Sequence, residues 1–220
     1  MPTRPTISIF PASPEDAPSL TRVHGDAFRD CILNDLMFGP PTEENLKGFA
    51  DELVGLITGD ITARFVKAVD NDTNKIVGWS WWNLYPDRES RSGGSQALSE
   101  ELGAPPESAI SPEAHKEYFQ GAAARQEKWI GGRPFAYLRV LVVLPEYQRK
   151  GIGANLIARG LEEATTCNLP VWLESSEVGY DLYKKLGFKD LNDSIVIDLA
   201  KYGASGISTT ACMWLETGNH

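Results

Sequence analysis

The sequence contains few cysteines and histidines, and this scarcity excludes several kinds of site. Its three cysteines, Cys31, Cys167 and Cys212, are odd in number and far apart, unlike a disulfide framework or a zinc site. This pattern predicts a reducing compartment, and we expect a cytoplasmic protein. Only three histidines occur in 220 residues, so a His-rich metal centre or a Ser-His-Asp triad has little material. We therefore expect no metal.

Long apolar runs and an excess of basic residues are also lacking. No stretch approaches the ~20 apolar residues of a membrane span, and residues 1–20 contain no apolar signal segment. The 21 Lys and Arg are outnumbered by 30 Asp and Glu, which gives a net charge of −9. This balance argues against nucleic-acid binding and favours cationic ligands. With 42% hydrophobic residues, the chain can bury a full core, and we expect one domain over residues 1–220.

The order of strand and helix patterns places the chain in the α/β class. A strand, helix and strand over residues 135–175 imply a right-handed crossover and a parallel strand pair. The tryptophan-rich strand around Trp79 and Trp82 suggests a strand buried on both faces, rather than an aromatic ligand cage. Expected strands span residues 6–10, 64–70, 75–85, 135–143, 170–175, 188–199 and 209–216, and expected helices span 14–28, 42–57, 112–131, 151–166 and 178–186.

Residues 86–134 read as an insertion, because they begin with polar and proline-punctuated sequence before a helix that starts after Ser111. We hypothesise that this insertion covers the site for the second substrate, with Tyr118, Phe119 and Trp129 as wall residues. A dimer contact or a surface helix fits the same sequence equally well.

The stretch LPEYQRKGIGANLI, residues 144–157, carries the clearest chemical signal. Gly151 and Gly153 stand where a strand gives way to a helix, and the unpaired N–H groups of a helix start attract anions. Arg149 and Lys150 add two cations, so we expect a phosphate or pyrophosphate ligand. No Gly-Lys-Ser/Thr follows, which excludes a P-loop. The dinucleotide-binding fingerprint requires a third small residue at the position of Leu156, so the sequence does not fit this fingerprint either.

The run from Gln148 to Gly153 fits the pattern Gln/Arg-x-x-Gly-x-Gly/Ala, and YKKLGF follows at residues 183–188. On these motifs the chain resembles the GCN5-related N-acetyltransferase (GNAT) family, specifically over residues 135–190. The stretch from LPVWLESS to LYKKLGF is similar to the branch of the puromycin-type acetyltransferases. The resemblance implies a mixed, mostly antiparallel sheet with a splayed parallel central strand pair and flanking helices.

The resemblance also implies acetyl-coenzyme A as cosubstrate. The backbone of Leu141, Val142 and Val143 would contact the pantetheine arm. Ser176 stands where the family often has an asparagine, seven positions before Tyr183, which weakens one expected cofactor contact. Pyrophosphate contacts would come from Gln148, Arg149, Lys150, Gly151, Ile152, Gly153 and Ala154.

For catalysis, the family's helix tyrosine corresponds to Tyr183, which we expect to be the general acid for the departing thiolate. Core packing is the alternative role for this tyrosine. Glu174, near the carboxyl end of its strand, is the candidate general base or substrate anchor, against a solvated or salt-bridged role. A backbone N–H near Val142 is the expected oxyanion donor.

Together these features predict direct transfer of acetyl from acetyl-coenzyme A to the primary amine of a small molecule. Acetylation of a protein lysine or N-terminus is an alternative, and a non-catalytic acyl-coenzyme A-binding module is another. We expect neither nucleic acid nor membrane as partner, and a monomer or a homodimer.

Overall fold

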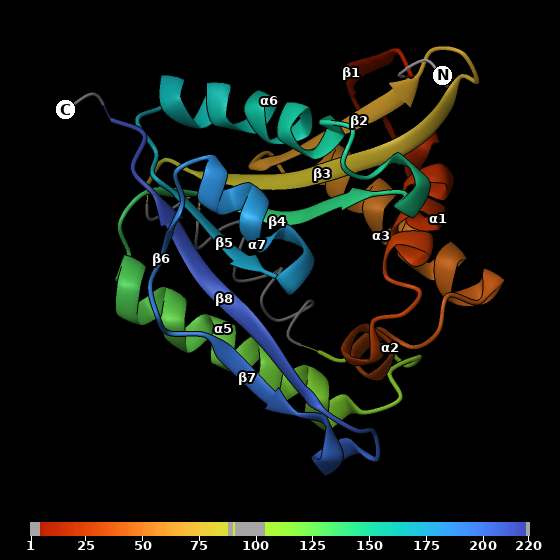
Figure 1. Ribbon diagram of the computed structural model, residues 1–220, viewed down its shortest axis with the longest axis vertical. Helices are drawn as coiled ribbons and strands as arrows, with labels where there is room; N and C mark the ends of the chain where they lie inside the picture. Colours follow the sequence, from red (N-terminus) through yellow and green to blue (C-terminus); the bar gives the residue numbers. More distant parts are fainter. Residues whose placement is uncertain (1–4, 88–89, 91–103, 219–220) are drawn as a thin grey trace. The chain divides into compact units, whose positions relative to one another are not determined.

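The computed structural model describes residues 5–87, 90 and 104–218 of the chain (Figure 1). The chain divides into two compact units and passes between them at five points, three of which lie within strand β3 (Lys75–Tyr85), strand β4 (Phe135–Val143) and helix α6 (Ile152–Thr166). Unit 1 comprises Met1–Arg29, Pro41–Leu84 and Leu138–Glu163, and unit 2 comprises Asp30–Pro40, Tyr85–Tyr137 and Ala164–His220.

Unit 1 is built on strands in the order β1-β2-β3-β4, with β2 antiparallel to both β1 and β3. The Leu144 N–H donates to Val77 O at 2.9 Å, which joins the exit of β4 to β3. The expected strands and helices of residues 6–85 are confirmed within a few residues. They are β1 (Ile7–Pro11), α1 (Ala17–Ala27), α3 (Glu43–Gly59), β2 (Ala63–Asp70) and β3 (Lys75–Tyr85), with a 3₁₀ turn at Pro14–Asp16.

The core of unit 1 contains the tryptophans of β3. Trp79 and Trp82 are fully buried, and Trp79 Nε1 donates to Leu20 O on α1 at 2.8 Å. On the other face, α6 packs so closely that a Cβ atom at Gly160 would overlap the ring of Trp82. The prediction of a strand buried on both faces is therefore confirmed.

Unit 2 is built on strands in the order β4-β5-β8-β6, and β7 also pairs with β8. The pairs that β8 makes with β5, β6 and β7 are all antiparallel. The elements that unit 2 adds are α2 (Ile32–Phe38), α5 (Pro112–Ile130), β5 (Val171–Ser175), α7 (Glu177–Lys185), β6 (Lys189–Asp190), β7 (Ile195–Asp198) and β8 (Ile207–Leu215), with a 3₁₀ turn at Leu199–Tyr202.

Strands β4 and β5 run in the same direction, as the crossover argument predicts. The Ala136 N–H near the start of β4 donates to Pro170 O just before β5 at 2.8 Å, so the two strands start next to each other. Helix α6 makes the connection between them. The expected fold class, a mixed and mostly antiparallel sheet with a parallel β4–β5 pair and flanking helices, is confirmed.

One expectation about secondary structure is wrong, and one helix was not expected. Residues 188–199 do not form one strand, because the chain turns between β6 and β7. At this turn Asp190 Oδ1 accepts from the Asn192 N–H at 2.8 Å, and Asn192 takes a positive φ of 54°. The helix that was not expected is α2, a short helix that lacks a polar N-cap because Cys31 precedes it.

Helix α5 belongs to the core of unit 2, and Figure 1 shows it running along β7 and β8. The Ser111 side chain caps it by accepting from the Ala114 N–H at 3.2 Å, and Gly131 ends it with φ 57°. Its buried His115 packs against the rings of Phe38 and Phe119. That residues 86–134 form an insertion stays a prediction, and residues 88–89 and 91–103 of this range lie outside the described part of the chain.

Candidate active site

The loop between β4 and α6 in unit 1 has a backbone that favours glycine. After a 3₁₀ turn at Pro145–Tyr147, Arg149 takes φ 61° and Gly151 takes φ 88° before α6 begins at Ile152. A side chain at a φ near 90° is strained, so Gly151 is required by the backbone itself. Nothing lies within 4 Å of the Cβ position that Gly151 lacks, which leaves this side of the loop open.

Side chains of the loop hold its shape from within. Gln148 Nε2 donates to Val143 O at 3.1 Å, and Lys150 Nζ donates to Glu146 O at 2.7 Å. The Lys150 ammonium also lies 4.9 Å from the centre of the Tyr147 ring. Tyr147 in turn donates to Asp70 Oδ2 at 2.6 Å, and this hydrogen bond lowers the pKa of Asp70. These contacts fix the loop before any ligand arrives.

The start of α6 offers backbone donors. The first intrahelical bond runs from the Asn155 N–H to Gly151 O at 3.1 Å, so the N–H groups of Ile152, Gly153 and Ala154 precede the helical hydrogen-bond ladder. The positive end of the helix dipole lies at the same place, beside the exposed cations Arg149 and Lys150. This arrangement suits an anion with several oxygens.

The exit of β4 carries the residues expected to contact a pantetheine arm. Val142 is buried, whereas Leu141 and Val143 are half-buried and pack against the cluster that joins α6 to the sheet. Gly78 on β3 lets strand β4 approach closely, because a Cβ atom at Gly78 would lie 2.8 Å from Val142 O. The sheet is therefore tightly packed on the β3 side of this strand.

In unit 2, Tyr183 lies on α7 and is 7% exposed. Its ring makes an edge contact with Phe188 at 5.6 Å, and burial raises the pKa of its hydroxyl well above the usual value. Gly179, one turn earlier, makes room for this ring, because a Cβ atom there would lie 2.8 Å from Tyr183 Cε2 and 3.6 Å from Ser175 Oγ. Tyr183 therefore adjoins the end of β5.

Glu174 projects from the opposite face of β5. Successive side chains of a strand alternate between faces, so Glu174 and Trp172 point one way and Ser175, beside Gly179, points the other. Three donors reach the Glu174 carboxylate, which is half-buried: Trp172 Nε1 at 2.7 Å, Gln126 Nε2 at 3.2 Å and Tyr137 Oη at 2.6 Å. Glu174 is neither freely solvated nor salt-bridged in these contacts.

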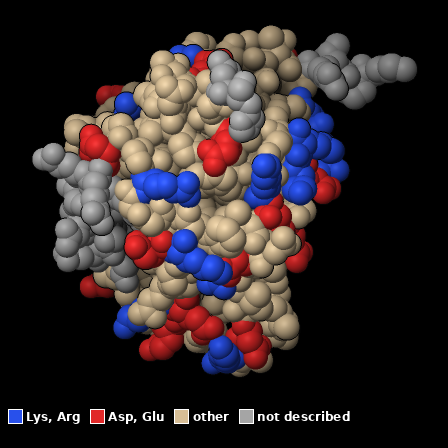
Figure 2. Space-filling model, turned by 90° about the vertical axis from the view of Figure 1, so that its left-hand side faces the viewer, with Lys and Arg blue, Asp and Glu red and all other residues tan. Residues whose placement is uncertain are grey.

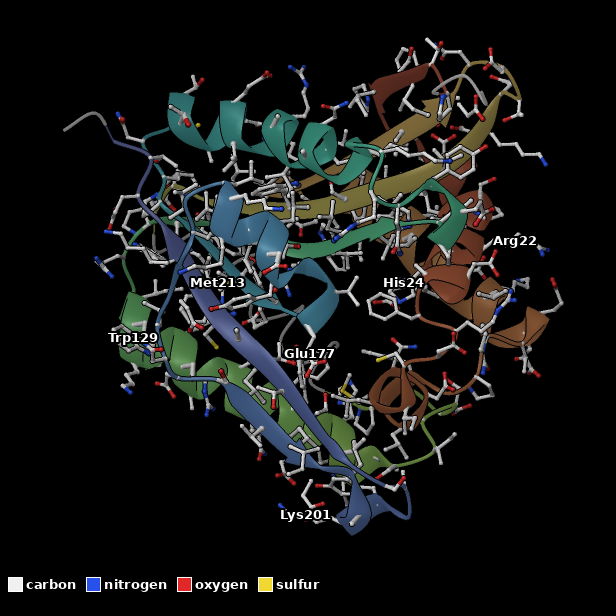
Figure 3. The ribbon with its side chains drawn as sticks, viewed as in Figure 1. Arg22, His24, Trp129, Glu177, Lys201 and Met213 are labelled. Atoms are coloured by element: carbon white, nitrogen blue, oxygen red, sulfur yellow. The ribbon has the colours of Figure 1, made fainter. Side chains whose placement is uncertain are left out.

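Ser176 is the N-cap residue of α7 and is exposed. It borders a pocket of about 270 Å³ at the first turn of this helix, where Figure 3 shows the acidic Glu177. Two of the residues that line the pocket, Glu177 and Asp190, are acidic, and none is basic. Its lining residues are Ser175, Ser176, Glu177, Tyr180, Asp190, Ser194, Thr209 and Ala211.

The structure therefore places the expected site residues in two groups. Leu141 to Ala154 form one continuous segment of unit 1, and Glu174, Ser176 and Tyr183 lie around the end of β5 in unit 2. The expected separation of β4 from β5 stays a prediction. Sequence reasoning missed Gln126, Tyr137 and Trp172 as partners of Glu174. Only Trp172 gave a local signal, because it stands two residues before Glu174 on the same strand face.

The expected wall residues of the insertion pack against the core of unit 2. Tyr118, Phe119 and Trp129 are partly buried, and Trp129 Nε1 donates to Asp193 Oδ2 at 2.9 Å (Figure 3 labels Trp129 on α5). Their role at an acceptor site stays a prediction. On the face drawn in Figure 2, most acidic side chains have basic ones beside them.

Residues 95–199 match the model of the acetyltransferase (GNAT) domain, a range that contains Gln148–Ala154, Glu174 and Tyr183. The chain carries a GNAT domain. A curated relative, the probable acyltransferase SID5 of Ajellomyces capsulatus, is 40% identical over 50 residues, which are 23% of this chain and 37% of that protein. The match thus spans little more than a third of that relative's length.

Solved structures show how widely the GNAT fold extends over the chain. Arylalkylamine N-acetyltransferase 2 of Aedes aegypti is 16% identical, with a TM-score of 0.66 over 97% of this chain and 100% of that chain. YncA of Salmonella typhimurium, a putative acetyltransferase solved with acetyl-CoA, is 14% identical, with a TM-score of 0.57 over 97% of this chain and 95% of that chain. The closer likeness to the puromycin-type branch stays a prediction.

No helix among residues 5–87, 90 and 104–218 is long and apolar enough to cross a membrane. Within the same residues, no group of three or more His, Cys, Asp and Glu side chains is arranged to hold a metal ion.

Proposed function

We propose that this protein is an acetyl-CoA-dependent N-acetyltransferase that acts on the primary amine of a small molecule by direct transfer in a ternary complex. The observation that carries the proposal is the loop from Gln148 to Ala154, in which a positive φ at Gly151 precedes the open start of α6. Backbone donors and two exposed cations at one place suit the pyrophosphate of coenzyme A. The GNAT domain match over this loop supports the same ligand.

The reaction needs few protein groups, because the thioester is already activated. The proposal assigns the pantetheine arm to the backbone of Leu141, Val142 and Val143, with the Val142 N–H as the donor to the thioester oxygen as negative charge develops there. Holding an amine next to the thioester carbonyl supplies much of the rate enhancement by proximity.

Tyr183 is the proposed general acid for the departing thiolate. A phenol is protonated at neutral pH and can donate, but the burial that raises the pKa of Tyr183 makes transfer to a thiolate uphill, so the role requires a hydrogen bond to the sulfur that is already in place. Glu174 is the proposed general base, which removes a proton from the amine before it attacks. The two residues lie on opposite faces of β5. Ser176, at the N-cap of α7, is proposed to contact the cofactor with a shorter reach than the usual asparagine.

The proposed acceptor is a cationic small amine, and the cytoplasm is the proposed location. The net charge of −9 and the anionic pocket at the start of α7 favour a ligand of this charge. The fold of the Aedes arylalkylamine N-acetyltransferase adds arylalkylamines to the amines worth testing. Monomer and homodimer are both compatible with the proposal.

Calorimetry with coenzyme A tests the proposal, because the loop is its central element. We expect binding to the wild-type protein, and binding about 10- to 100-fold weaker for Arg149→Ala/Lys150→Ala. The matched control is Lys184→Ala/Lys185→Ala, an adjacent basic pair at the end of a helix, where the dipole disfavours anions. Equal losses for both pairs, or no binding to the wild type, would count against the loop.

Thiol release from acetyl-CoA then separates the possible functions. A panel of primary amines, including arylalkylamines, and of lysine and N-terminal peptides is offered to the protein. Turnover of small amines supports the proposal. Turnover of peptides alone would favour a protein acetyltransferase, and tight cofactor binding without any turnover would favour a non-catalytic binding module.

A further inference from the structure

The Glu174 carboxylate is held by side chains from three elements of unit 2. Trp172 of β5 and Gln126 of α5 both donate to Oε1, at 2.7 Å and 3.2 Å, and Tyr137 of β4 donates to Oε2 at 2.6 Å. None of these contacts depends on the conformation of a surface loop, because each donor stands on a regular helix or strand. The carboxylate is thus fixed in position and orientation before any substrate binds.

Counting acceptor positions shows where this carboxylate can take another donor. An ionised carboxylate offers about four lone-pair sites, two on each oxygen. Trp172 and Gln126 fill both sites of Oε1, whereas Tyr137 fills one site of Oε2. Among the donors of residues 5–87, 90 and 104–218, none takes the other acceptor position of Oε2, next to the Tyr137 hydroxyl. A half-buried carboxylate with one such position accepts a single further N–H or O–H in a defined direction.

The titratable groups that face Glu174 do not compete with it for charge near neutral pH. Tyr118 of α5 and Cys212 of β8 both interact with it electrostatically, and burial raises the pKa of Tyr118 and raises that of Cys212 to about 12. Both are therefore uncharged near neutral pH. Arg125 of α5 and Asp193 form an ion pair with each other at 3.2 Å.

We infer that Gln126 is a positioning residue for the proposed base: together with Trp172 it occupies Oε1, so that Oε2, shared with Tyr137, is the atom that takes the proton from the acceptor. In this step an N–H bond of the acceptor ammonium breaks and an O–H bond forms at Oε2. The electron pair left on nitrogen then attacks the thioester carbonyl. The inference rests on the proposed function, and it gives helix α5 a part in the chemistry through Glu174.

Substitutions at Gln126 change the donor to Oε1 in a graded way. Gln126→Leu removes one donor to the ionised form, and Gln126→Glu replaces it with a like charge at nearly the same size. Losing a hydrogen bond to the charged form makes a carboxylate easier to protonate, and a like charge does so more strongly. Gln120→Leu, at an exposed position of the same helix, is the matched control.

Two readouts follow the protonation of Glu174. The first is the indole N–H resonance of Trp172, which reports on its acceptor directly by NMR and needs no substrate. The second is the acidic limb of kcat/KM against pH for the best amine of the panel. We expect both midpoints to move upward together, by about one pH unit in Gln126→Leu and further in Gln126→Glu. In Gln120→Leu we expect both to stay at the wild-type values.

Each other outcome overturns the inference in a recognisable way. If the NMR midpoint moves while the acidic limb of activity stays, Gln126 supports a carboxylate that is only structural. If neither midpoint moves, Gln126 does not act on Glu174. Cofactor binding without turnover of any amine would remove the base role, whereas failure of coenzyme A to bind would remove the proposed function itself. Should the Gln126 variants fail to fold, Tyr137→Phe removes a donor from Oε2 and shifts both midpoints upward by the same logic.

Discussion

The two units present their candidate functional groups in different ways. In unit 1 the loop from Gln148 to Ala154 offers main-chain N–H groups, and the side chains of Gln148 and Lys150 hold the loop in shape. In unit 2 the candidate groups are single side-chain atoms, the hydroxyl of Tyr183 and the carboxylate of Glu174, which packing and hydrogen bonds hold in place. A site made of backbone depends on φ and on close approach, whereas a site made of side chains depends on individual atoms.

This difference predicts different responses to mutation. Removing one oxygen atom in unit 2 is expected to affect the rate and leave the fold intact. In unit 1, adding one methyl group at a glycine is expected to affect the fold or cofactor binding. The substitutions below test that contrast, starting with the largest effect.

Tyr183→Phe is expected to have the largest effect, a loss in kcat of about 100- to 10,000-fold, because it removes the proposed proton donor and keeps the ring. Affinity for coenzyme A and the melting temperature are expected to change little, since the hydroxyl adds little to the contact with Phe188. Steady-state kinetics and calorimetry measure these quantities. A variant that retains full activity would assign Tyr183 to packing alone and would break the contrast between the units.

Gly160→Ala is expected to have the next largest effect, here on stability. The added Cβ atom overlaps the buried ring of Trp82, so α6 must shift, and we expect a loss of about 2–3 kcal/mol in the free energy of unfolding. Gly48→Ala is the matched control, because Gly48 lies within α3 with nothing within 4 Å of its Cβ position. The control should gain about 0.5–1 kcal/mol. Urea unfolding measures both, and equal signs would contradict the predicted overlap.

Gly151→Ala tests the loop itself. Space exists for the new methyl group, but the φ of 88° does not suit a residue with a side chain, and we expect a strain of about 1–2 kcal/mol. If the loop relaxes to relieve this strain, its N–H groups turn away from the ligand, and coenzyme A binds about tenfold more weakly. Calorimetry checks this value. Unchanged affinity would show that the loop geometry is not needed for binding.

The loop from Gln148 to Ala154 is predictable from sequence because its signals are local. The hydrogen-bond partners of Glu174 are not, because two of them are far from it along the chain. Gly151 and Gly153 announce a strand-to-helix junction within a few residues, and both the helix and its start are where the sequence indicates. Two of the three partners of Glu174 come from other elements, Gln126 from α5 and Tyr137 from β4. Gln126 lies 48 positions away from Glu174 along the chain. No periodicity relates residues at that separation, because tertiary packing alone brings them together.

The closing strands show a different limit of sequence reading. The apolar residues from Phe188 to Leu199 suggest one strand, although the residues between Leu191 and Ile195 are types that favour a turn. In the fold, Asp190 and Asn192 close a turn there, and the Asp193 carboxylate accepts hydrogen bonds from Lys128 and Trp129. The break is therefore stabilised partly by α5, which a reading of the strand alone does not include.

The smallest expected effect concerns the anchor of the loop in unit 1, where Tyr147 donates to the buried Asp70 and lowers its pKa. A carboxyl group whose pKa falls on folding stabilises the protein above its unfolded pKa of about 4, and this contribution is lost as the pH falls through the lower folded value. Tyr147→Phe should therefore melt below the wild type at pH 6, and the difference should shrink toward zero near pH 2. Thermal melts across this range measure it. On an Asp70→Asn background the same substitution should show no pH dependence, and a pH-dependent difference that persists there would trace the effect to a titrating group other than Asp70.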